Sequence, residues 1–362
     1  MKKYILALFT ATVLLCGCGK GSSDTSQVSE ESSDSVFSSR DLSQTADTSS
    51  AETLELKGED IEITKDGVYI ITGQTTGASI IVNASPTDKV QLVLEGISIE
   101  NESKPAIKVL SADKCFITTT EKENKLTLSD NFDASGEAAV IYSKTDLVIN
   151  GLGTLNVESK TGNGISCDDD LKITGGNVNV VSFLDGIEVK DEFLLNDGNI
   201  NIISQKDGIH CEKNNGEKGS LKVFNGSLDI EATKNGIRTA TSAIFEDGNI
   251  NIKAGEGVES TLIDIKGGNL TIEAEEDGLN AGNKSVGTTT PNIDISGGNV
   301  NISVTGEVSD AVDSNGDISI SGGNINIDTA FSSFDYAGNA TFTGGKLVVN
   351  GEELTEIPPS SK

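Results

Sequence analysis

Oxygen-bearing side chains recur at fixed places in eight short phrases of this chain. Each phrase starts with such a side chain, mostly followed by glycine and an apolar residue, as in Asp185-Gly186-Ile187-Glu188. The first residues are Asn163, Asp185, Asp207, Asn235, Glu256, Asp277, Asp310 and Ser332. The residues three positions later are Ser166, Glu188, His210, Arg238, Glu259, Asn280, Asp313 and Asp335. Carboxylate and amide oxygens are ligands for Ca²⁺, which tolerates irregular sets of them better than Mg²⁺ does.

A second phrase, of the type Gly-Gly-Asn, sets the period of the repeat. Its second glycine falls at positions 176, 198, 226, 248, 268, 298, 323 and 345, so most steps are near 22 residues and the longer ones fit loop insertions. The phrase opens a short strand with alternating apolar residues, and another short strand such as Leu171-Lys172-Ile173 precedes it. Three strands and three corners per repeat predict an all-β fold, a right-handed parallel β-helix (solenoid) with coils of about 22 residues.

Stacked coils lie about 4.8 Å apart, so the two sets of oxygen-bearing residues should form two columns along one edge. Carboxylates at that spacing repel by roughly 1 kcal/mol per pair in water and by about 3.5 kcal/mol at an effective dielectric constant of 20. Bound calcium would offset this repulsion. The predicted calcium ligands are Asp185, Glu188, Asp207, Glu256, Glu259, Asp277, Asn280, Asp310, Asp313 and Asp335. The alternative is that Asp-Gly and Asn-Gly only form turns with solvated side chains.

Other positions of the repeat have simpler interpretations. In each phrase, the residue directly after Asp-Gly should point inward, and so should the residue two positions after that one. Cys167 and Cys211 occupy the second of these inward positions. The asparagines of the Gly-Gly-Asn phrases should stack as a structural ladder of amides. His210 and Arg238 interrupt the acidic columns and are predicted to contact substrate.

The amino terminus predicts export. A short positive end and the apolar run from Tyr4 to Leu15 are typical of a signal peptide, assigned to residues 1–17. Cys18, preceded by Gly17, is a better lipid acceptor than Cys16. Residues 18–52 are expected to be a Ser/Thr-rich disordered tether, 53–350 the β-helix (with looser coils and a cap over 53–160) and 351–362 a tail. The expected location is the extracellular face of the cell membrane, held by a lipid anchor.

Composition excludes several classes of function. The formal net charge is -29, with 56 acidic and 27 basic residues, which argues against nucleic acid as a partner. Aromatic residues make up 4% and Trp is absent, which argues against flat aromatic platforms for sugars. Three cysteines remain after processing (Cys115, Cys167 and Cys211), and this odd number predicts no disulfide framework. A monomer is expected.

From Leu54 to Val349 the chain resembles a family of bacterial surface proteins described as carbohydrate-binding domain-containing proteins. The phrases that carry the resemblance most specifically are those from Asp277 to Asn283 and from Asp310 to Asp317. The resemblance implies a calcium-binding parallel β-helix related in shape to pectate lyases, which binds cellulose or acidic pectic chains. The departures from the family pattern are Asn235 and Arg238 in place of acids, His210 within the column and Ser332 at its end.

Four functions remain open. The first is non-catalytic binding, in which calcium on the acidic edge bridges to uronate carboxylates. The second is a calcium-dependent pectate or polyuronate lyase, with Arg238 or one of the nearby lysines Lys190, Lys206 and Lys213 as the base. A hydrolase has less support, because nothing distinguishes one carboxylate pair, such as those in Asp168-Asp169-Asp170, from the others. The fourth is an adhesin or spacer without sugar specificity.

Overall fold

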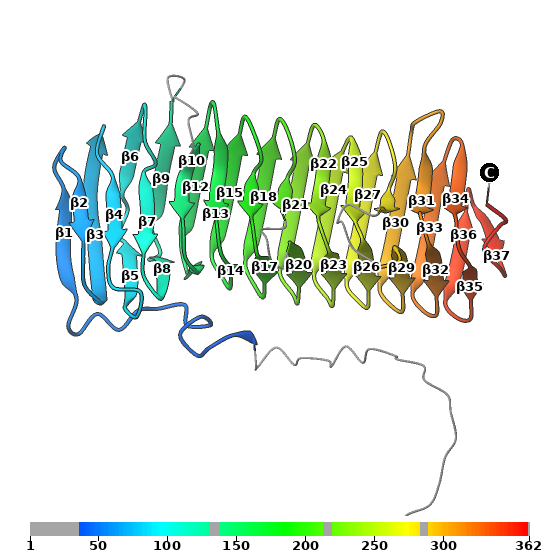
Figure 1. Ribbon diagram of the computed structural model, residues 1–362, viewed down its shortest axis with the longest axis horizontal. Helices are drawn as coiled ribbons and strands as arrows, with labels where there is room; N and C mark the ends of the chain where they lie inside the picture. Colours follow the sequence, from blue (N-terminus) through cyan, green and yellow to red (C-terminus); the bar gives the residue numbers. More distant parts are fainter. Residues whose placement is uncertain (1–35, 130–137, 213–218, 283–288, 361–362) are drawn as a thin grey trace, which may run out of the picture. The chain divides into compact units, whose positions relative to one another are not determined.

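The predicted coils follow one another along the chain from Glu52 onwards. The computed structural model describes residues 36–129, 138–212, 219–282 and 289–360. Residues 37–362 form one unit, and it contains every strand of the described residues. The fold is a parallel β-solenoid of about 11 turns, whose coils lie side by side from β1 to β36 (Figure 1). Coils are about 24 residues apart on average, more than the predicted 22, because insertions lengthen some of them.

Three parallel sheets, named here A, B and C, run along the solenoid. Sheet A begins with β1, and β3 is long enough to join sheets A and C. The strands of sheet A are β1 (Glu52–Leu56), β3 (Gly67–Thr76), β5 (Lys89–Leu94), β8 (Lys114–Thr119), β11 (Leu147–Gly151), β14 (Leu171–Ile173), β17 (Glu192–Leu195), β20 (Ser220–Val223), β23 (Ser242–Phe245), β26 (Leu262–Ile265), β29 (Asn292–Ile295), β32 (Asp317–Ile320) and β35 (Ala340–Phe342).

Sheet B contains the phrases with the oxygen-bearing side chains. Its strands are β2 (Ile61–Ile63), β4 (Ile80–Asn83), β7 (Ile107–Ser111), β10 (Ala139–Ser143), β13 (Asn163–Cys167), β16 (Ile187–Val189), β19 (Ile209–Cys211), β22 (Asn235–Thr239), β25 (Glu256–Ser260), β28 (Leu279–Ala281), β31 (Asp310–Ser314) and β34 (Ser332–Tyr336).

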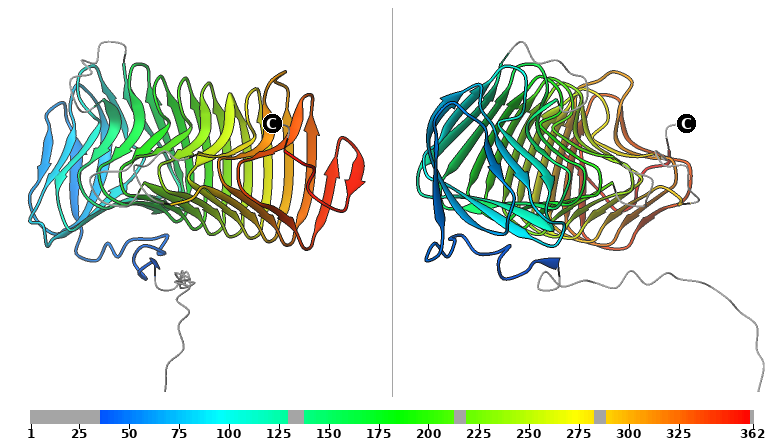
Figure 2. Two further views of the ribbon diagram at one scale, coloured as in Figure 1. Left: turned by 45° about the vertical axis from the view of Figure 1, so that its right-hand side comes forward. Right: turned by 60° about the vertical axis from the view of Figure 1, so that its left-hand side comes forward.

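Sheet C contains the strands that follow the Gly-Gly-Asn turns. Beyond the end of β3, its strands are β6 (Ser98–Asn101), β9 (Glu123–Leu128), β12 (Thr154–Ser159), β15 (Asn177–Ser182), β18 (Asn199–Ser204), β21 (Ser227–Ala232), β24 (Asn249–Ala254), β27 (Asn269–Ala274), β30 (Asn299–Val304), β33 (Asn324–Thr329), β36 (Lys346–Val349) and β37 (Glu352–Leu354). The oblique views in Figure 2 show the strands of each sheet lying one behind another.

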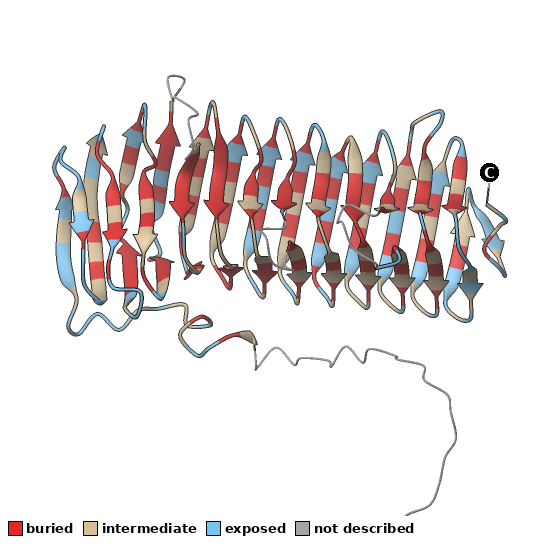
Figure 3. Ribbon diagram, in the orientation of Figure 1, coloured by how far each residue is buried: buried red, intermediate tan, exposed pale blue. Residues whose placement is uncertain are grey.

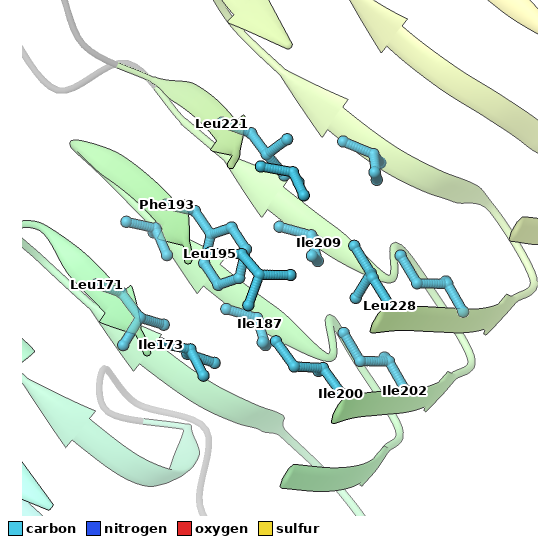
Figure 4. Close-up of a cluster of buried hydrophobic side chains, with 14 of the residues drawn as sticks. Leu171, Ile173, Ile187, Phe193, Leu195, Ile200, Ile202, Ile209, Leu221 and Leu228 are labelled. Atoms are coloured by element: carbon cyan, nitrogen blue, oxygen red, sulfur yellow. The ribbon is translucent and has the colours of Figure 1, made fainter. Parts of the chain in front are cut away.

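The core is a continuous apolar column between the three sheets. Alternate residues of each strand point inward, as in Ile200 and Ile202 of β18, and Figure 3 shows the resulting bands of buried and exposed residues. Figure 4 shows Ile187, Leu195 and Ile200 converging from sheets B, A and C. Cys115, Cys167 and Cys211 are free and buried, as predicted. The core thus gains area with each added coil, which is how a solenoid becomes stable.

Two kinds of glycine permit this stacking. Gly176 and its equivalents after it adopt positive φ (82° for Gly176), which glycine tolerates at the corner before sheet C. Gly186, in the Asp-Gly phrase, has no positive φ, but a Cβ there would lie 2.3 Å from Cγ2 of Ile202 and 2.6 Å from the carbonyl oxygen of Gly208. Glycine in the Asp-Gly phrases is therefore required by the closeness of neighbouring atoms rather than by a turn.

Residues 37–47, named here the N-terminal strap, pack on the outer face of sheet A. From the sequence, these residues are expected to be part of the disordered tether. In the structure the Phe37 ring meets Phe224 edge to face at 5.3 Å, and the Arg40 guanidinium lies 4.5 Å from the centre of the Phe116 ring. Asp41 is 1% exposed and pairs with Lys114 and Lys172. The strap thus covers part of the outer face of sheet A through aromatic contacts, ion pairs and hydrogen bonds.

The carboxyl-terminal residues close the last coil. β37 pairs antiparallel with β36, and Ile357 is buried against the core. The predicted tail therefore includes a hairpin strand and a capping side chain. The predicted signal peptide and Cys18 lie outside the described residues. No helix among the described residues is both long and apolar enough to cross a membrane.

Candidate functional site

Sheet B stacks the oxygen-bearing residues into the two predicted columns. The strand register places Glu188 beside both Ser166 and His210, and Glu259 beside both Arg238 and Asn280. The remaining pairs of this second column are His210 with Arg238, Asn280 with Asp313, and Asp313 with Asp335. The alignment deduced from the repeat is therefore confirmed residue by residue, although alignment alone does not show what the side chains bind.

The first column is a ladder of hydrogen bonds between side chains and backbone. In each case an Oδ1 oxygen accepts the backbone N–H of the equivalent residue one coil later, which joins adjacent coils. The N–H to oxygen pairs are Asp185 to Asn163 (3.0 Å), Asp207 to Asp185 (3.1 Å), Asn235 to Asp207 (3.1 Å) and Asp310 to Asp277 (2.8 Å). Asp and Asn at these positions thus have a structural role, which neither predicted interpretation included.

Asp185, Asp207 and His210 form a buried cluster whose ligand atoms lie within 4.8 Å of one another. Asp185 Oδ2 accepts a hydrogen bond from Lys206 Nζ at 2.8 Å and lies 3.4 Å from His210 Nδ1. Burial alone would raise the pKa of Asp185, but the hydrogen bonds from His210 and Lys206 hold it below its usual value. Burial raises the pKa of Asp207, and the charge of Asp185 adds to the rise. Both oxygens of Asp185 are therefore already used by protein donors.

The positive charge of Arg238 compensates the negative charge of the carboxylates around it. Its Nε lies 3.1 Å from Glu259 Oε2 and its Nη1 lies 3.9 Å from Asp207 Oδ2. The same Glu259 oxygen accepts a hydrogen bond from Asn235 Nδ2 at 2.9 Å. The Arg238 side chain is 41% exposed and that of His210 is 8% exposed. Of the two predicted substrate contacts, only Arg238 has substantial surface to offer a polysaccharide.

Glu188 and Glu256 are held by neighbouring amides. Glu188 Oε2 accepts hydrogen bonds from Asn163 Nδ2 at 2.7 Å and from the Ser166 hydroxyl at 2.9 Å. Glu256 Oε1 accepts one from Asn280 Nδ2 at 2.6 Å. Asn280 therefore acts as a donor here, whereas a calcium ligand would present its oxygen.

In the carboxyl-terminal coils, the negative charge of the carboxylates is compensated less. Burial raises the pKa of Asp277, and the charges of Asp310, Glu276 and Asp335 raise it further. The buried Oδ1 of Asp310 accepts no hydrogen bond from the described residues. Asp335, which is 2% exposed, accepts a hydrogen bond from the hydroxyl of Ser360. Among the predicted ligands, Asp277 and Asp310 thus have carboxylates whose negative charge is compensated less than that of Asp185.

A second acidic cluster lies at the corner between sheets B and A. Asp169 and Asp170 precede β14, and Asp191 occupies the same corner one coil later. Their carboxylate oxygens lie within 4.8 Å of one another, and all three residues are partly exposed. The nearby Asp146 has its pKa raised to about 6 by burial and by the charges of Asp169 and Asp170. The run of three aspartates was visible in the sequence, but only stacking with Asp191 distinguishes it from other acidic pairs.

The corner cluster contains only oxygen donors, which suits a hard divalent cation. The Asp185, Asp207 and His210 cluster fits such a cation poorly, because it includes an imidazole and the ammonium group of Lys206. Lys213, one of the proposed bases, lies outside the described residues.

The fold and the sequence both match known proteins. Residues 57–262 and 259–355 match the family described as "Carbohydrate-binding domain-containing protein". A relative with that description from Acetivibrio thermocellus is 35% identical over 190 residues, which are 50% of this chain and 65% of the relative. The chain thus spans a little under two thirds of that relative.

A solved structure shares the architecture. It is described as the polysaccharide lyase-like protein from C. thermocellum, in a gadolinium derivative. It is 28% identical to this chain, with a TM-score of 0.55, and the match covers 58% of this chain and 93% of the other.

Proposed function

Because the chain belongs to the family of carbohydrate-binding domain-containing proteins, we propose that it binds plant cell-wall polysaccharide without cleaving it. The polymers are cellulose or acidic pectic chains, and calcium assists the binding of the acidic ones. The observation that supports calcium most directly is the corner cluster, in which Asp169, Asp170 and Asp191 gather oxygen donors at the solvent-facing edge of two coils.

Calcium overcomes an electrostatic obstacle. A protein with a formal net charge of -29 repels a polyuronate, whereas a cation held by protein carboxylates can bind a uronate carboxylate as an additional oxygen ligand. The proposed ligands of the corner cluster are Asp169, Asp170 and Asp191. Asp277 and Asp310 are proposed as a second place for a cation, with Asp313 and Asp335 beside them.

The interactions of Lys190, Lys206 and Arg238, the described candidates for the base of a lyase, oppose that role. The hydrogen bond to Asp168 raises the pKa of Lys190. Burial alone would lower the pKa of Lys206, but its hydrogen bond to Asp185 and the charges of Asp207 and Glu188 raise it. The Arg238 guanidinium is held between Glu259 and Asp207. A general base must give up its proton near neutral pH, and these interactions oppose that.

The decisive experiment is a pull-down on insoluble cellulose and on polygalacturonate, with calcium and with a chelator. We expect binding of polygalacturonate with calcium and loss of that binding with chelator. The double variant Asp170→Asn, Asp191→Asn should abolish the calcium effect, while the control Asp197→Asn, at an exposed turn, should keep it. Binding and melting that are insensitive to chelator would overturn the role of calcium. Unsaturated uronate product, followed by its ultraviolet absorbance, would overturn the non-catalytic assignment.

The proposed location on the cell surface has a separate test. Lipid attachment at Cys18 would hold the β-helix at the outer surface of the membrane. The variant Cys18→Ser should move the protein from the membrane fraction to the medium, and Cys16→Ser should not. Membrane retention of the Cys18→Ser protein would refute the anchor.

A further inference from the structure

The outer face of sheet C, from β12 to β33, is named here the amide face. It carries rows of asparagines that donate to one another across the coils. Asn201 Nδ2 donates to Asn179 Oδ1 at 2.9 Å, and Asn251 Nδ2 donates to Asp229 Oδ1 at 2.7 Å. In the neighbouring row, Nδ2 donates to Oδ1 of the preceding coil at 2.8 or 2.9 Å in the pairs Asn199 to Asn177, Asn269 to Asn249, Asn299 to Asn269 and Asn324 to Asn299. The predicted amide ladder is thus present.

The ladder uses only half of the hydrogen-bonding capacity of each amide. A carboxamide has two N–H donors and two acceptor lone pairs, and the ladder takes one donor and one acceptor. Asn199, Asn201, Asn251 and Asn299 are exposed, so their remaining donors and acceptors face solvent. The ladder also fixes the amide planes, which lowers the entropy lost when a ligand binds to them. The face therefore presents an ordered set of donors and acceptors at every coil.

A shallow groove runs along the amide face in the direction of the solenoid axis. A hollow of about 470 Å³ extends from Asn201 to Thr271, and a second of about 410 Å³ extends from Glu231 to Thr305. The two hollows share Glu231, Lys253 and Glu273, so they lie side by side on the same face. The groove thus crosses successive coils and could hold an extended polymer.

One end of the groove is apolar. Ile203 lines the first hollow and is 47% exposed, and its register neighbour Val181 is 46% exposed. Phe183, two residues beyond Val181, is 55% exposed. Exposed apolar residues gathered beside a polar groove match the surface of a sugar ring, which has C–H faces and a rim of hydroxyl groups.

The negative charge of the groove favours an uncharged polymer over an acidic one. Asp229, Glu231, Glu273 and Glu275 line it, against the single lysine Lys253. This acidic lining repels a polyuronate but not an uncharged chain. Neighbouring coils lie ~4.8 Å apart, which is similar to the length of one sugar ring, so each ring of an extended chain can face about one coil.

We infer that the amide face binds an uncharged, extended polysaccharide chain that lies along the groove, with one sugar ring per coil. This rests on the proposed polysaccharide-binding function and assigns the neutral polymer to sheet C, whereas the acidic corner cluster lies at the corner between sheets B and A. Hydroxyl groups of the chain bond to the outward donors and acceptors of the amides, and Phe183 and Ile203 contact ring faces.

The first test fills the groove. Thr271→Trp places a large side chain in the first hollow, at a partly exposed position of β27 where an aromatic residue suits a strand. The matched control is Ser319→Trp, at a partly exposed outward position of β32 in sheet A. Measured with cellohexaose by calorimetry and with insoluble cellulose by pull-down, Thr271→Trp should weaken binding at least tenfold and Ser319→Trp should not.

The second test removes a contact without filling space. Phe183→Ala should weaken cellohexaose binding several-fold, whereas Leu152→Ala, which removes an equally exposed apolar side chain (52%), should not. Neither change removes a buried side chain, so misfolding does not complicate the comparison. Equal affinities for Phe183→Ala, Thr271→Trp and the unchanged protein would overturn the inference.

Binding of polygalacturonate separates the two proposals. If the unchanged protein binds polygalacturonate with calcium but neither cellohexaose nor cellulose, the amide-face inference fails and the proposed function stands. If it binds none of these polymers, both fail. If Thr271→Trp loses cellohexaose binding and keeps calcium-dependent polygalacturonate binding, both are supported.

Discussion

The Oδ1 oxygen of Asp185 accepts the backbone N–H of Asp207, one coil further along, at 3.1 Å. Two predicted calcium ligands are thus partners in a hydrogen bond that joins neighbouring coils. Since Oδ2 of Asp185 also accepts a hydrogen bond from Lys206, this carboxylate contributes to the structure of sheet B rather than to a calcium site.

Two substitutions of Asp185 should separate the contribution of its hydrogen bond to Asp207 from that of its ion pair with Lys206. Asp185→Ala removes the acceptor of a buried N–H and the partner of Lys206, and should lower the free energy of unfolding by about 1–3 kcal/mol. Asp185→Asn keeps the Oδ1 acceptor and loses only the ion pair, so its loss should be smaller. Thermal melting, monitored by circular dichroism, shows which of the two variants loses more stability. Identical melting temperatures for the two variants would contradict the ladder role.

Acid should stabilise the corner cluster. The pKa of Asp146 is raised to about 6 in the folded protein, from about 3.8 in an unfolded chain. A raised pKa contributes stability that is complete below pH 3.8 and is lost as the pH rises through 6. Asp146→Asn should therefore raise the free energy of unfolding at pH 7 by about 1–2 kcal/mol, after allowance for solvent screening, and change it little at pH 4.

The control for Asp146 is Asp113→Asn, which removes an exposed carboxylate from a neighbouring turn. Melting temperatures of both variants between pH 4 and pH 8 give the comparison. A stabilisation of Asp146→Asn that is the same at both ends of this range would show that the effect is not electrostatic.

The N-terminal strap should detach without unfolding the solenoid. Asp41 lies 3.4 Å from Lys114 and 3.8 Å from Lys172, and its backbone oxygen accepts a hydrogen bond from Asn150 at 3.2 Å. Asp41→Ala leaves the two lysines without their buried partner, so limited proteolysis should cleave near residues 37–50 much faster than in the unchanged protein. Asp47→Asn, in the exposed part of the strap, is the control. Equal cleavage rates would contradict the account of the strap.

The three core cysteines should be chemically inert in the folded state. Burial raises the pKa of Cys115 to about 12 and raises the pKa of Cys167 and of Cys211 strongly as well. Since the thiolate is the reactive form, iodoacetamide at pH 8 should leave these thiols unmodified in the folded protein and modify all three in urea. Peptide mass spectrometry measures the modification of each cysteine. Modification of Cys167 in the folded protein would show that sheet B opens.

The sequence alone determined the solenoid and its register. The period near 22 residues, the Gly-Gly-Asn turns and the inward Ile positions each follow from local chemistry, and stacking repeats that chemistry at every coil. The pairs Glu188 with His210 and Glu259 with Asn280 therefore follow from the sequence repeat itself. The amide ladder followed from the same repetition.

Only the tertiary structure decided which oxygens are available to a ligand. The alignment of the repeats places Asp185 and Asp277 in one column, but Lys206, which directly precedes Asp207, donates a hydrogen bond to Asp185. Asp191 joins Asp169 and Asp170 because a corner of one coil stacks on the next. The N-terminal strap depends on contacts between residues as far apart as Phe37 and Phe224, for which a Ser/Thr-rich segment carries no local signal. Local periodicity determines backbone position, whereas long-range side-chain contacts determine which charges are already paired.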